Sequence, residues 1–358
     1  MTRAVWIQRW RGLAAIGLAV AGCAVTPPSP VAPPQPVAAT APVPKADTGV
    51  PVPARAEGVI ARNDRFIIYV AVAGDTLQSL ARRFLGSETR GALIADFNDV
   101  RKIEPGQTVV IPLAATNRPG VHPNGVQLVT VLCYHRFGRE RGKMVLTPDS
   151  FAAQLEYLAR NDYRVVRLAD LLEFLEGRRA LPKRAVVITI DDGYASSHSI
   201  AFPILKRHGF PATVFVYTDY VGSRDALTWA QMREMTDSGL IEIQSHSKSH
   251  PNLTLRLPDE SEQQYRDRID REVRVPRDLL QSRLMESVSS YAYPYGDANE
   301  LVIERLRQAG HRLAFTVNPG GNSAFSFPMM VRRTMIFGDH DLDAFKSKLE
   351  VFKELNLR

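Results

Sequence analysis

Short apolar runs alternate with amphipathic segments of helical length from residue 126 onward, and this alternation restricts the fold more than any other feature. Two strands joined through a helix pair in parallel, because the helix returns the chain to the starting edge of the sheet. About seven such units favour a closed barrel, so we expect an α/β domain over residues 126–356. The expected strands are 127–133, 185–190, 212–217, 241–244, 289–293, 313–317 and 331–336, and the expected helices are 149–161, 168–177, 195–208, 228–238, 260–284, 298–309 and 341–355.

Polar side chains follow two of the expected strands. Asp191 and Asp192 come directly after the apolar run "VVITI", and "SHSKSH" follows "LIEIQ" with His246 and His250 four residues apart. Barrels of parallel strands collect their chemistry at the C-terminal ends of the strands. On a helical turn, a spacing of four points both imidazoles the same way. Two imidazoles and one carboxylate form a facial set that suits Zn²⁺ or a similar divalent ion.

Two adjacent carboxylates can divide the work of a hydrolytic site. One can bind a metal together with the two histidines, while the other deprotonates a water that the metal activates. Taken alone, "DDG" is equally typical of a helix N-cap and turn, and a His-x-x-x-His pattern is equally typical of a polar surface. Their joint placement after successive expected strands favours the catalytic interpretation. A rigid proline–glycine loop, "PYGDAN", follows a further expected strand, "SSYAY".

The motifs "TIDDGY", "SHSKSH" and "YPYG", in this order, resemble those of NodB-type polysaccharide deacetylases, carbohydrate esterase family 4, over residues 126–340. The resemblance implies a distorted (β/α)7 barrel. It implies that Asp191 is the catalytic base and that a divalent metal, Zn²⁺ with Co²⁺ or Ni²⁺ as alternatives, is bound. It also implies that the backbone N–H of Tyr295 stabilises the oxyanion, and that Pro294 and the Tyr295 ring contact substrate. The implied metal ligands are Asp192, His246 and His250.

Two features depart from that family pattern. The arginine that normally begins the third motif and orients the catalytic aspartate is replaced by Ala292, and no C-terminal strand ends in a histidine, since His340 lies in a polar loop. Together with "VLCYHRF" and "ALTWAQMREM", these departures resemble the branch that deacetylates poly-β-1,6-N-acetylglucosamine. That resemblance implies that His135 is a pocket residue and proton donor; a structural histidine is the alternative. Trp229 either contacts sugar or packs behind the helix cap Thr228.

The first residues are typical of a secretory leader. Residues 1–22 have basic residues, then an apolar stretch from Leu13 to Ala21 that is too short to span a bilayer. The ending "VAGC" resembles a bacterial lipobox, which implies that Cys23 is lipidated and anchors the chain to a membrane. Ala24 after the cysteine, rather than Asp, implies sorting to the outer membrane of the cell envelope, facing the periplasm. An ordinary signal peptide with a chance cysteine is the alternative.

Residues 23–58 are dominated by Pro, Ala and Val. Such a composition cannot build a core and favours extended polyproline II structure, so we expect a disordered tether. The second cysteine, Cys133, lies in the apolar run "VQLVTVLCYH" and is expected to be a buried packing residue without a disulfide.

Residues 66–113 predict a small module of their own. A strand at 66–72 leads to Asp75 and Thr76, either of which can cap a helix through Phe84; a second helix around 90–98 and the strand "TVVIP" follow. This β-α-α-β order, with "YVAVAGDTLQSLARRF" and "IEPGQTVVIP", resembles a LysM domain. The resemblance implies binding of N-acetylglucosamine-containing chains by the loops around 74–77 and 98–103. A generic two-helix cap is the alternative.

The whole chain therefore predicts an enzyme of the cell envelope. A formal net charge of +7 that is dispersed along the chain, without a nucleic-acid motif, argues against a nucleic-acid partner. We expect a lipid-anchored, metal-dependent hydrolase that removes acetyl groups from N-acetylglucosamine in a polysaccharide. The LysM-like module favours peptidoglycan, whereas the barrel's departures favour an exopolysaccharide. The alternatives are a catalytically inactive LysM peptidoglycan-binding lipoprotein and an O-acetyl esterase.

Overall fold

The computed structural model describes residues 58–63, 66–98, 100–113, 118–122, 125–140 and 142–355. The expected leader with Cys23 and nearly all of the expected tether lie outside the described residues. No helix in the described part of the chain is both long enough and apolar enough to cross a membrane.

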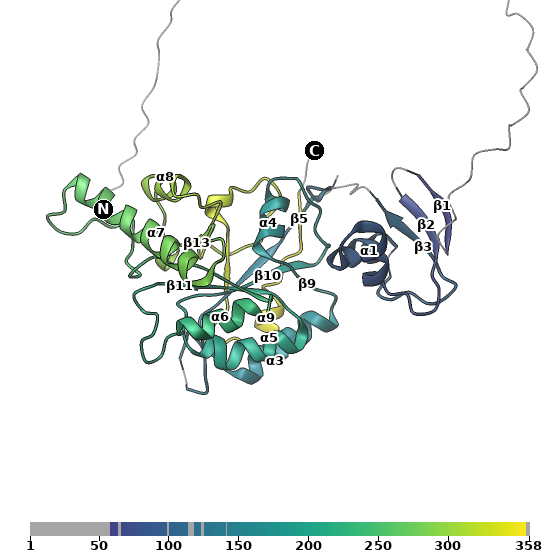
Figure 1. The fold of residues 1–358 in the computed structure, drawn as a ribbon, viewed down its shortest axis with the longest axis horizontal. Coiled ribbons are helices and arrows are strands. Elements are labelled where there is room, and N and C mark those ends of the chain that lie inside the picture. Colours follow the sequence, from purple (N-terminus) through teal and green to yellow (C-terminus); the bar gives the residue numbers. More distant parts are fainter. Residues whose placement is uncertain are drawn as a thin grey trace, which may run out of the picture. The chain divides into compact units, whose positions relative to one another are not determined.

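The N-terminal module contains β1 (Val59–Arg62), β2 (Phe66–Val70), α1 (Leu77–Leu85), α2 (Gly91–Asn98) and β3 (Thr108–Pro112) (Figure 1). Its antiparallel sheet has the order β1-β2-β3, so β1 adds a strand to the expected β-α-α-β arrangement. The Thr76 hydroxyl accepts a hydrogen bond from the Ser79 amide at 3.0 Å, which caps α1 as the sequence indicates. Buried apolar side chains from both helices and from β2 and β3 form a core of the module's own.

The second part is a barrel of parallel strands, as the sequence predicts. Its described strands are β6 (Thr130–Tyr134), β10 (Ala185–Ile190), β11 (Ala212–Val216), β12 (Ile241–Ser245), β13 (Ser290–Ala292), β14 (Leu313–Phe315) and β15 (Thr334–Met335). They follow the order β14-β13-β12-β11-β10-β6-β15, and β9 (Arg164–Val165) pairs with the start of β10. The segment entering β15 closes the ring, because the amide of Val331 donates to Ala314 at 2.9 Å and its carbonyl accepts from Thr316 at 2.9 Å.

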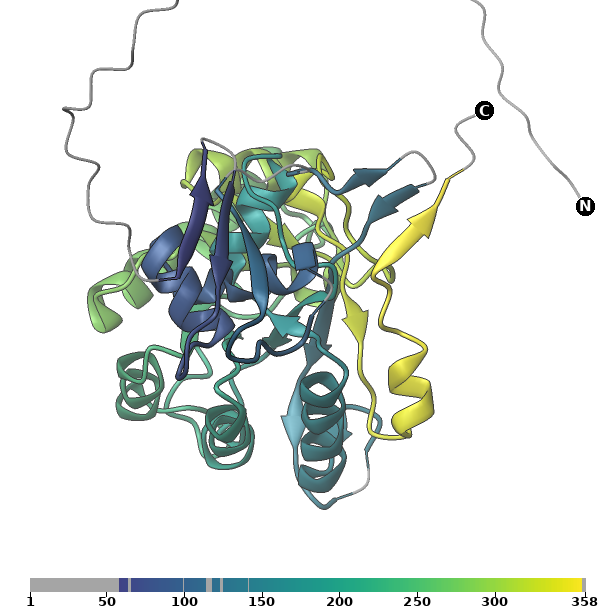
Figure 2. The same ribbon diagram turned by 90° about the vertical axis from the view of Figure 1, so that its right-hand side faces the viewer.

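The described helices that connect these strands are α3 (Pro148–Arg160), α4 (Leu168–Leu175), α5 (Phe202–His208), α6 (Trp229–Asp237), α7 (Glu262–Leu284), α8 (Glu300–Gln308) and α9 (Leu342–Lys346). The expectation of a helix over 341–355 is wrong beyond Lys346. There the chain forms β16 (Phe352–Glu354), which pairs antiparallel with β5 (Gly125–Gln127), so backbone pairing with a distant strand replaces helical bonding. In Figure 2 the yellow β16 lies beside the dark teal strands of this small sheet, which also contains β4 (Val121–His122).

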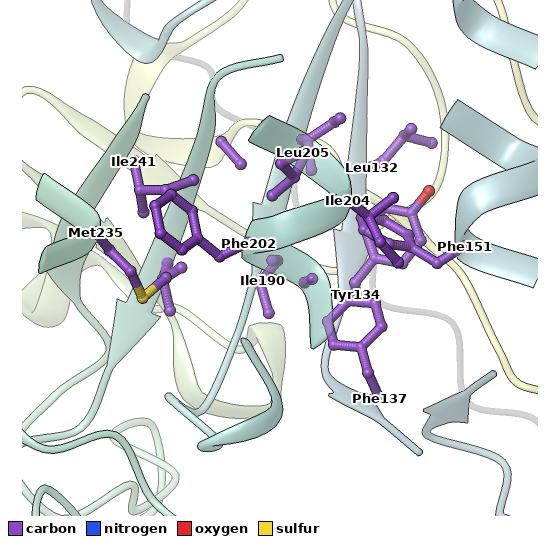
Figure 3. Packing of buried hydrophobic residues seen from close by; sticks show 14 of the residues in the cluster. Leu132, Tyr134, Phe137, Phe151, Ile190, Phe202, Ile204, Leu205, Met235 and Ile241 are labelled. Carbon is purple, nitrogen blue, oxygen red and sulfur yellow. The ribbon is translucent and has the colours of Figure 1, made fainter. Parts of the chain in front are cut away.

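Side chains of β6 and β10 alternate between two apolar layers. Leu132, Tyr134, Ile188 and Ile190 pack outward against buried side chains of α3, α5 and α6, as Figure 3 shows for part of the cluster. Val131 belongs to the other layer, which includes Val187, Phe215, Phe315 and Val331. Every residue of β10 is buried, which explains why the strand is apolar except for Thr189, whose hydroxyl donates to the carbonyl of Leu132.

Candidate active site

The structure brings Asp192, His246 and His250 together at the C-terminal ends of β10 and β12. The Oδ1 atom of Asp192 lies 3.5 Å from Nε2 of His246 and 3.4 Å from Nε2 of His250. The three potential ligand atoms all lie within 4.8 Å of one another. This is the same set of residues that the motifs point to.

The two histidines do not meet on a helical turn, and that expectation is wrong. Ser247 and His250 have φ values of 80° and 59°, so the chain between the histidines follows a left-handed path that a helix excludes. Asp192 and Tyr295 are left-handed as well, with φ values of 72° and 63°. Residues other than glycine persist in this conformation only where the surrounding structure holds them, which is common at functional sites.

The protonation of the cluster is set by its neighbours. Nδ1 of His246 lies 2.8 Å from the carbonyl oxygen of Ala292, so Nδ1–H donates there and Nε2 is the ring nitrogen that faces Asp192. Burial opposes protonation of His246, but Asp191 and Asp192 outweigh that cost and raise the pKa of this imidazole. Burial, together with nearby His246, lowers the pKa of His250. Burial opposes ionisation of Asp192, but His246 outweighs that cost and lowers the pKa of this carboxyl. His250 therefore offers an unprotonated ring nitrogen beside the ionised carboxylate of Asp192.

Asp191 is held by an arginine that the sequence analysis missed. The two terminal nitrogens of Arg333 each lie 2.7 Å from one carboxylate oxygen of Asp191, and both side chains are fully buried. Nε of Arg333 donates to the carbonyl of Thr316 at 2.9 Å, which fixes the plane of the guanidinium. Burial alone would raise the pKa of Asp191, but the guanidinium outweighs it and lowers this pKa, so the carboxyl stays ionised.

This ion pair corrects the expectation that Asp191 lacks an arginine partner because Ala292 stands in the third motif. The partner comes instead from the segment that closes the barrel. A signal was present in the sequence: Arg333 lies two residues after the inward-facing Val331, and the alternation of a strand places it on the same side.

Cys133 and His135 lie beside Asp191 at the end of β6. The thiol of Cys133 is 3.5 Å from Oδ2 of Asp191, so this buried, free cysteine contacts the site as well as packing in the barrel. Nδ1 of His135 is buried and has no hydrogen-bond partner among the described residues, and burial lowers the pKa of this imidazole. Although Cys133, His135 and Asp191 could form a second ligand set, the guanidinium on both oxygens of Asp191 opposes a cation there.

The loop after β13 places Tyr295 next to the cluster. The Tyr295 side chain is 61% exposed, and its ring centroid lies 4.9 Å from that of His250. Pro294 begins the turn and is buried. Gly296 has a φ of 80°, and a Cβ atom there would lie 2.6 Å from the backbone nitrogen of Val317, so only glycine fits at this position.

Trp229 opens α6 and is partly buried against the outer apolar cluster. The guanidinium of Arg283 lies 5.7 Å from the centroid of its ring. Thr228 caps the helix by accepting from the Gln231 amide at 3.3 Å. These contacts are those of a packing residue. Of the two roles that the sequence allows for Trp229, packing and sugar contact, they favour packing.

A row of tyrosines that the sequence analysis missed leads away from His250. The ring of Tyr217 lies 5.2 Å from that of His250 and stacks on Tyr220 at 5.0 Å, with an angle of 12° between the ring planes. Tyr220 meets Tyr194 edge to face at 5.7 Å, and the guanidinium of Arg136 lies 5.4 Å from the Tyr194 centroid. We call Tyr194, Tyr217 and Tyr220 the tyrosine row. The row cannot be predicted from any single segment of the sequence, because it joins the loops after β10 and β11.

Comparison with known proteins finds sequence similarity to polysaccharide deacetylases. Residues 178–314 match the family "Polysaccharide deacetylase". The poly-beta-1,6-N-acetyl-D-glucosamine N-deacetylase of Escherichia coli strain K12 is 27% identical over 59% of this chain, and the match covers 36% of that enzyme's length. The family match contains both aspartates, the two histidines and Tyr295, whereas His135 and Arg333 lie outside it.

Two solved structures share the fold. IcaB from Ammonifex degensii is 28% identical, with a TM-score of 0.55 over 59% of this chain and 93% of that chain. The Streptococcus pyogenes deacetylase PplD, solved in complex with acetate, is 25% identical, with a TM-score of 0.57 over 63% of this chain and 99% of that chain. Together with the family match, these likenesses show that the chain contains a polysaccharide deacetylase domain of the NodB type.

Proposed function

We propose that this chain is a metal-dependent hydrolase that removes N-acetyl groups from N-acetylglucosamine units of a cell-envelope or exported polysaccharide. The observation that carries the proposal is the cluster of Asp192, His246 and His250 beside a second carboxylate, Asp191, that is kept ionised. The substrate class rests on the E. coli relative, whose name specifies N-deacetylation of poly-β-1,6-N-acetylglucosamine.

The residues of the cluster fit a divalent metal. Ligand atoms about 2.0–2.1 Å from a tetrahedral Zn²⁺ lie roughly 3.3 Å apart, and the separations from Asp192 Oδ1 to the two imidazoles are 3.5 and 3.4 Å. The bond from His246 Nδ1 to a backbone carbonyl is the outer contact that metal-binding histidines commonly make. Zn²⁺ suits this donor set, with Co²⁺ and Ni²⁺ as alternatives.

The neighbouring residues supply the remaining chemistry. When bound, the metal would polarise the acetamide carbonyl and make hydroxide available near neutral pH. Asp191 accepts the proton of the attacking water while Arg333 holds its carboxylate in place. The water oxygen bonds to the acetyl carbon and the C–N bond breaks. The leaving amine takes up the proton that Asp191 accepted from the water, and we assign the neighbouring neutral imidazole of His135 as the group that relays it. The products are acetate and a free amine on the sugar.

The tyrosine row is the surface we assign to the saccharide chain. Aromatic faces suit the apolar C–H faces of pyranose rings, and phenolic hydroxyls can exchange hydrogen bonds with sugar hydroxyls. Tyr217 touches the ring of the ligand residue His250, so the row begins where the acetamide would react. Tyr295, whose ring also contacts that of His250, adds a further aromatic side chain to this surface.

We further propose that residues 66–113 are a LysM module that binds the polymer, and that lipidated Cys23 tethers the enzyme to the outer membrane on its periplasmic side. The support is the residue pattern and, for the module, a compact sheet-and-helix core. Replacing Cys23 by Ser should release the protein from the membrane fraction. Membrane association of Cys23→Ser that resists salt washing would contradict the anchor.

Acetate release from four polymers in parallel tests the activity: poly-β-1,6-N-acetylglucosamine, chitooligosaccharides, peptidoglycan and an O-acetylated polysaccharide. We expect Zn²⁺-loaded protein to release acetate from at least one N-acetylated polymer, with free amines appearing in equal amount. Release from the O-acetylated polymer alone would identify an esterase. No release from any polymer, with an Asp191→Asn control equally silent, would favour an inactive binding protein.

A further inference from the structure

The five residues from His246 to His250 carry both imidazoles of the cluster, and a buried carboxylate of another element holds the turn between them. Glu272 of α7 is only 7% exposed. Its Oε2 atom accepts from the backbone amides of Lys248 and Ser249, both at 2.9 Å, and its Oε1 atom accepts from the Ser249 hydroxyl at 2.6 Å.

The opposite side of the same turn is held by the loop after β11. The amide of Thr218 donates to the carbonyl of Ser247 at 3.3 Å, and the amide of Asp219 donates to the carbonyl of Lys248 at 2.9 Å. Within the turn, the amide of His250 donates to the Ser247 hydroxyl at 2.8 Å. The turn is therefore held both by Glu272 and by the loop after β11.

Glu272 lies on the buried side of α7, where an unpaired carboxylate would be unfavourable. The other residues on the buried stripe of α7 include Tyr265, Ile269, Val273 and Leu280, all of them largely apolar. Burying an ionised carboxylate among them is unfavourable unless hydrogen bonds compensate for the lost water. Glu272 forms no ion pair among the described residues, so the three donors of the turn are its compensation.

The turn between the histidines also requires a hydrogen-bond acceptor at the position of the Glu272 carboxylate. Two amides and one hydroxyl point toward the same place, and an ionised carboxylate, which only accepts, can satisfy all three. Ser247 and His250 are both left-handed, a conformation that relaxes when its restraints are removed. Loss of the restraint would move His250 relative to His246, which is fixed separately through Ala292.

We propose that Glu272 is a positioning residue of the metal centre, which presets the separation of the two imidazoles by bonding the turn between them. The inference rests on the proposed metal-dependent function. It concerns metal affinity, because partners that orient metal ligands typically change that affinity when they are replaced.

The test measures Zn²⁺ affinity of the full chain by competition with a chromophoric chelator, without reference to activity. Glu272→Gln keeps the shape but turns an amide NH₂ toward one of the donors, so we expect affinity to fall about 10- to 100-fold. The matched control is Asp270→Asn on the same helix, whose carboxylate lies 3.7 Å from Arg274 and from Arg305 rather than on the turn. This control should bind Zn²⁺ like the parent.

Circular dichroism and melting of the metal-free proteins separate positioning from loss of fold. A folded Glu272→Gln with parental affinity would overturn this inference alone. A parent whose Zn²⁺ binding is absent, or does not depend on Asp192, would overturn the proposed metal centre and this inference with it. If Glu272→Gln does not fold, Ser249→Ala removes one of the three bonds and leaves α7 intact. About 3-fold weaker binding is then expected, and unchanged binding would overturn the proposal.

Discussion

The guanidinium of Arg333 clasps both carboxylate oxygens of Asp191 across a separation of 142 residues in the chain. Such a planar, two-point contact fixes the orientation of a carboxylate as well as its charge, which a lysine cannot do. The residue that we assign as the base is thus oriented by the segment that enters β15 and closes the barrel.

Replacing Arg333 by Lys should lower acetate release with little change in bound metal. Lysine keeps the positive charge but loses the second hydrogen bond, so Asp191 would no longer be held in one plane. Loss of a well-placed general base costs about 10²–10⁴-fold, and we expect a decrease of about 10²-fold in kcat. Arg332→Lys, at the exposed neighbouring position, is the control and should keep its activity. Parental turnover in Arg333→Lys would contradict the role.

Variants of the two adjacent aspartates should differ in the amount of metal that they bind. Asp192→Asn should lose metal, because a neutral amide is a poorer ligand beside His246 and His250. Asp191→Asn should keep its metal while turnover falls about 10²–10⁴-fold. It should also unfold more readily, by about 3–5 kcal/mol, because Arg333 would be left buried without its partner. Mass-spectrometric metal analysis with acetate-release kinetics decides between these assignments, and equal metal loss in both variants would refute them.

Tyr220→Leu should raise KM for long substrates more than for a short oligosaccharide. Tyr220 lies in the middle of the tyrosine row and contacts Tyr194 and Tyr217 rather than the ring of His250, so its loss should mainly remove contact with sugars beyond the reacting one. An aromatic contact is worth about 0.5–1.5 kcal/mol, which corresponds to a rise of roughly 2- to 10-fold. Tyr220→Phe distinguishes the ring from the hydroxyl. The control is Phe325→Leu, an exposed aromatic residue that packs against Gly177 instead.

Stability should fall below neutral pH because of His311. This imidazole is 3% exposed and packs against Tyr291, and burial lowers its pKa to about 3. In the unfolded chain the His311 imidazole therefore takes up a proton near pH 6.5, whereas in the folded chain it stays neutral at that pH. The stabilisation is complete above about pH 6.5 and is lost progressively as pH falls toward 3, at about 1.4 kcal/mol per unit.

Urea unfolding at pH 7 and pH 5 measures this effect. Between these values the parent should lose about 2 kcal/mol more stability than His311→Leu, in which the buried proton acceptor is absent. Other histidines titrate equally in both proteins and cancel in the difference. Equal losses in the two proteins would show that His311 is protonated in the folded state.

Deleting residues 59–115 should leave the barrel folded and active on short soluble oligosaccharides. The residues removed have their own buried core, and the parallel strand order of the barrel does not include them. Binding to insoluble peptidoglycan should decrease in a pull-down assay. Loss of turnover on short substrates by a folded barrel would contradict the modular interpretation.

The sequence predicts those parts of the molecule that depend on local pattern. Apolar runs located the strands of the barrel. Because parallel strands end at one rim, one carboxylate of the Asp191–Asp192 pair was expected beside His246 and His250, and the resemblance to the deacetylase family implied that it is Asp192. The C-terminal helix was extended too far, since pairing of β16 with β5 involves a strand more than two hundred residues earlier.

The features that escaped prediction depend on contacts between distant segments. Arg333 reaches Asp191 only because the ring of strands closes, and Glu272 reaches the histidine turn only because α7 packs behind it. The left-handed path of that turn follows from the same contacts. Each had a local sign, a charged residue in an otherwise apolar pattern, but the partner of a buried charge cannot be read from its neighbours in sequence.

The closing strand also sets an order of events during synthesis. The ligand residues Asp192, His246 and His250 are all made before the segment that carries Val331 and Arg333. A nascent chain that has grown only to Gly310 holds every ligand of the cluster, yet its barrel has a gap and Asp191 has no guanidinium. We therefore expect competence for the proposed hydrolysis to arrive only with the segment that carries Arg333. A chain that stops before this segment would keep the proposed metal ligands but lack the guanidinium that holds Asp191.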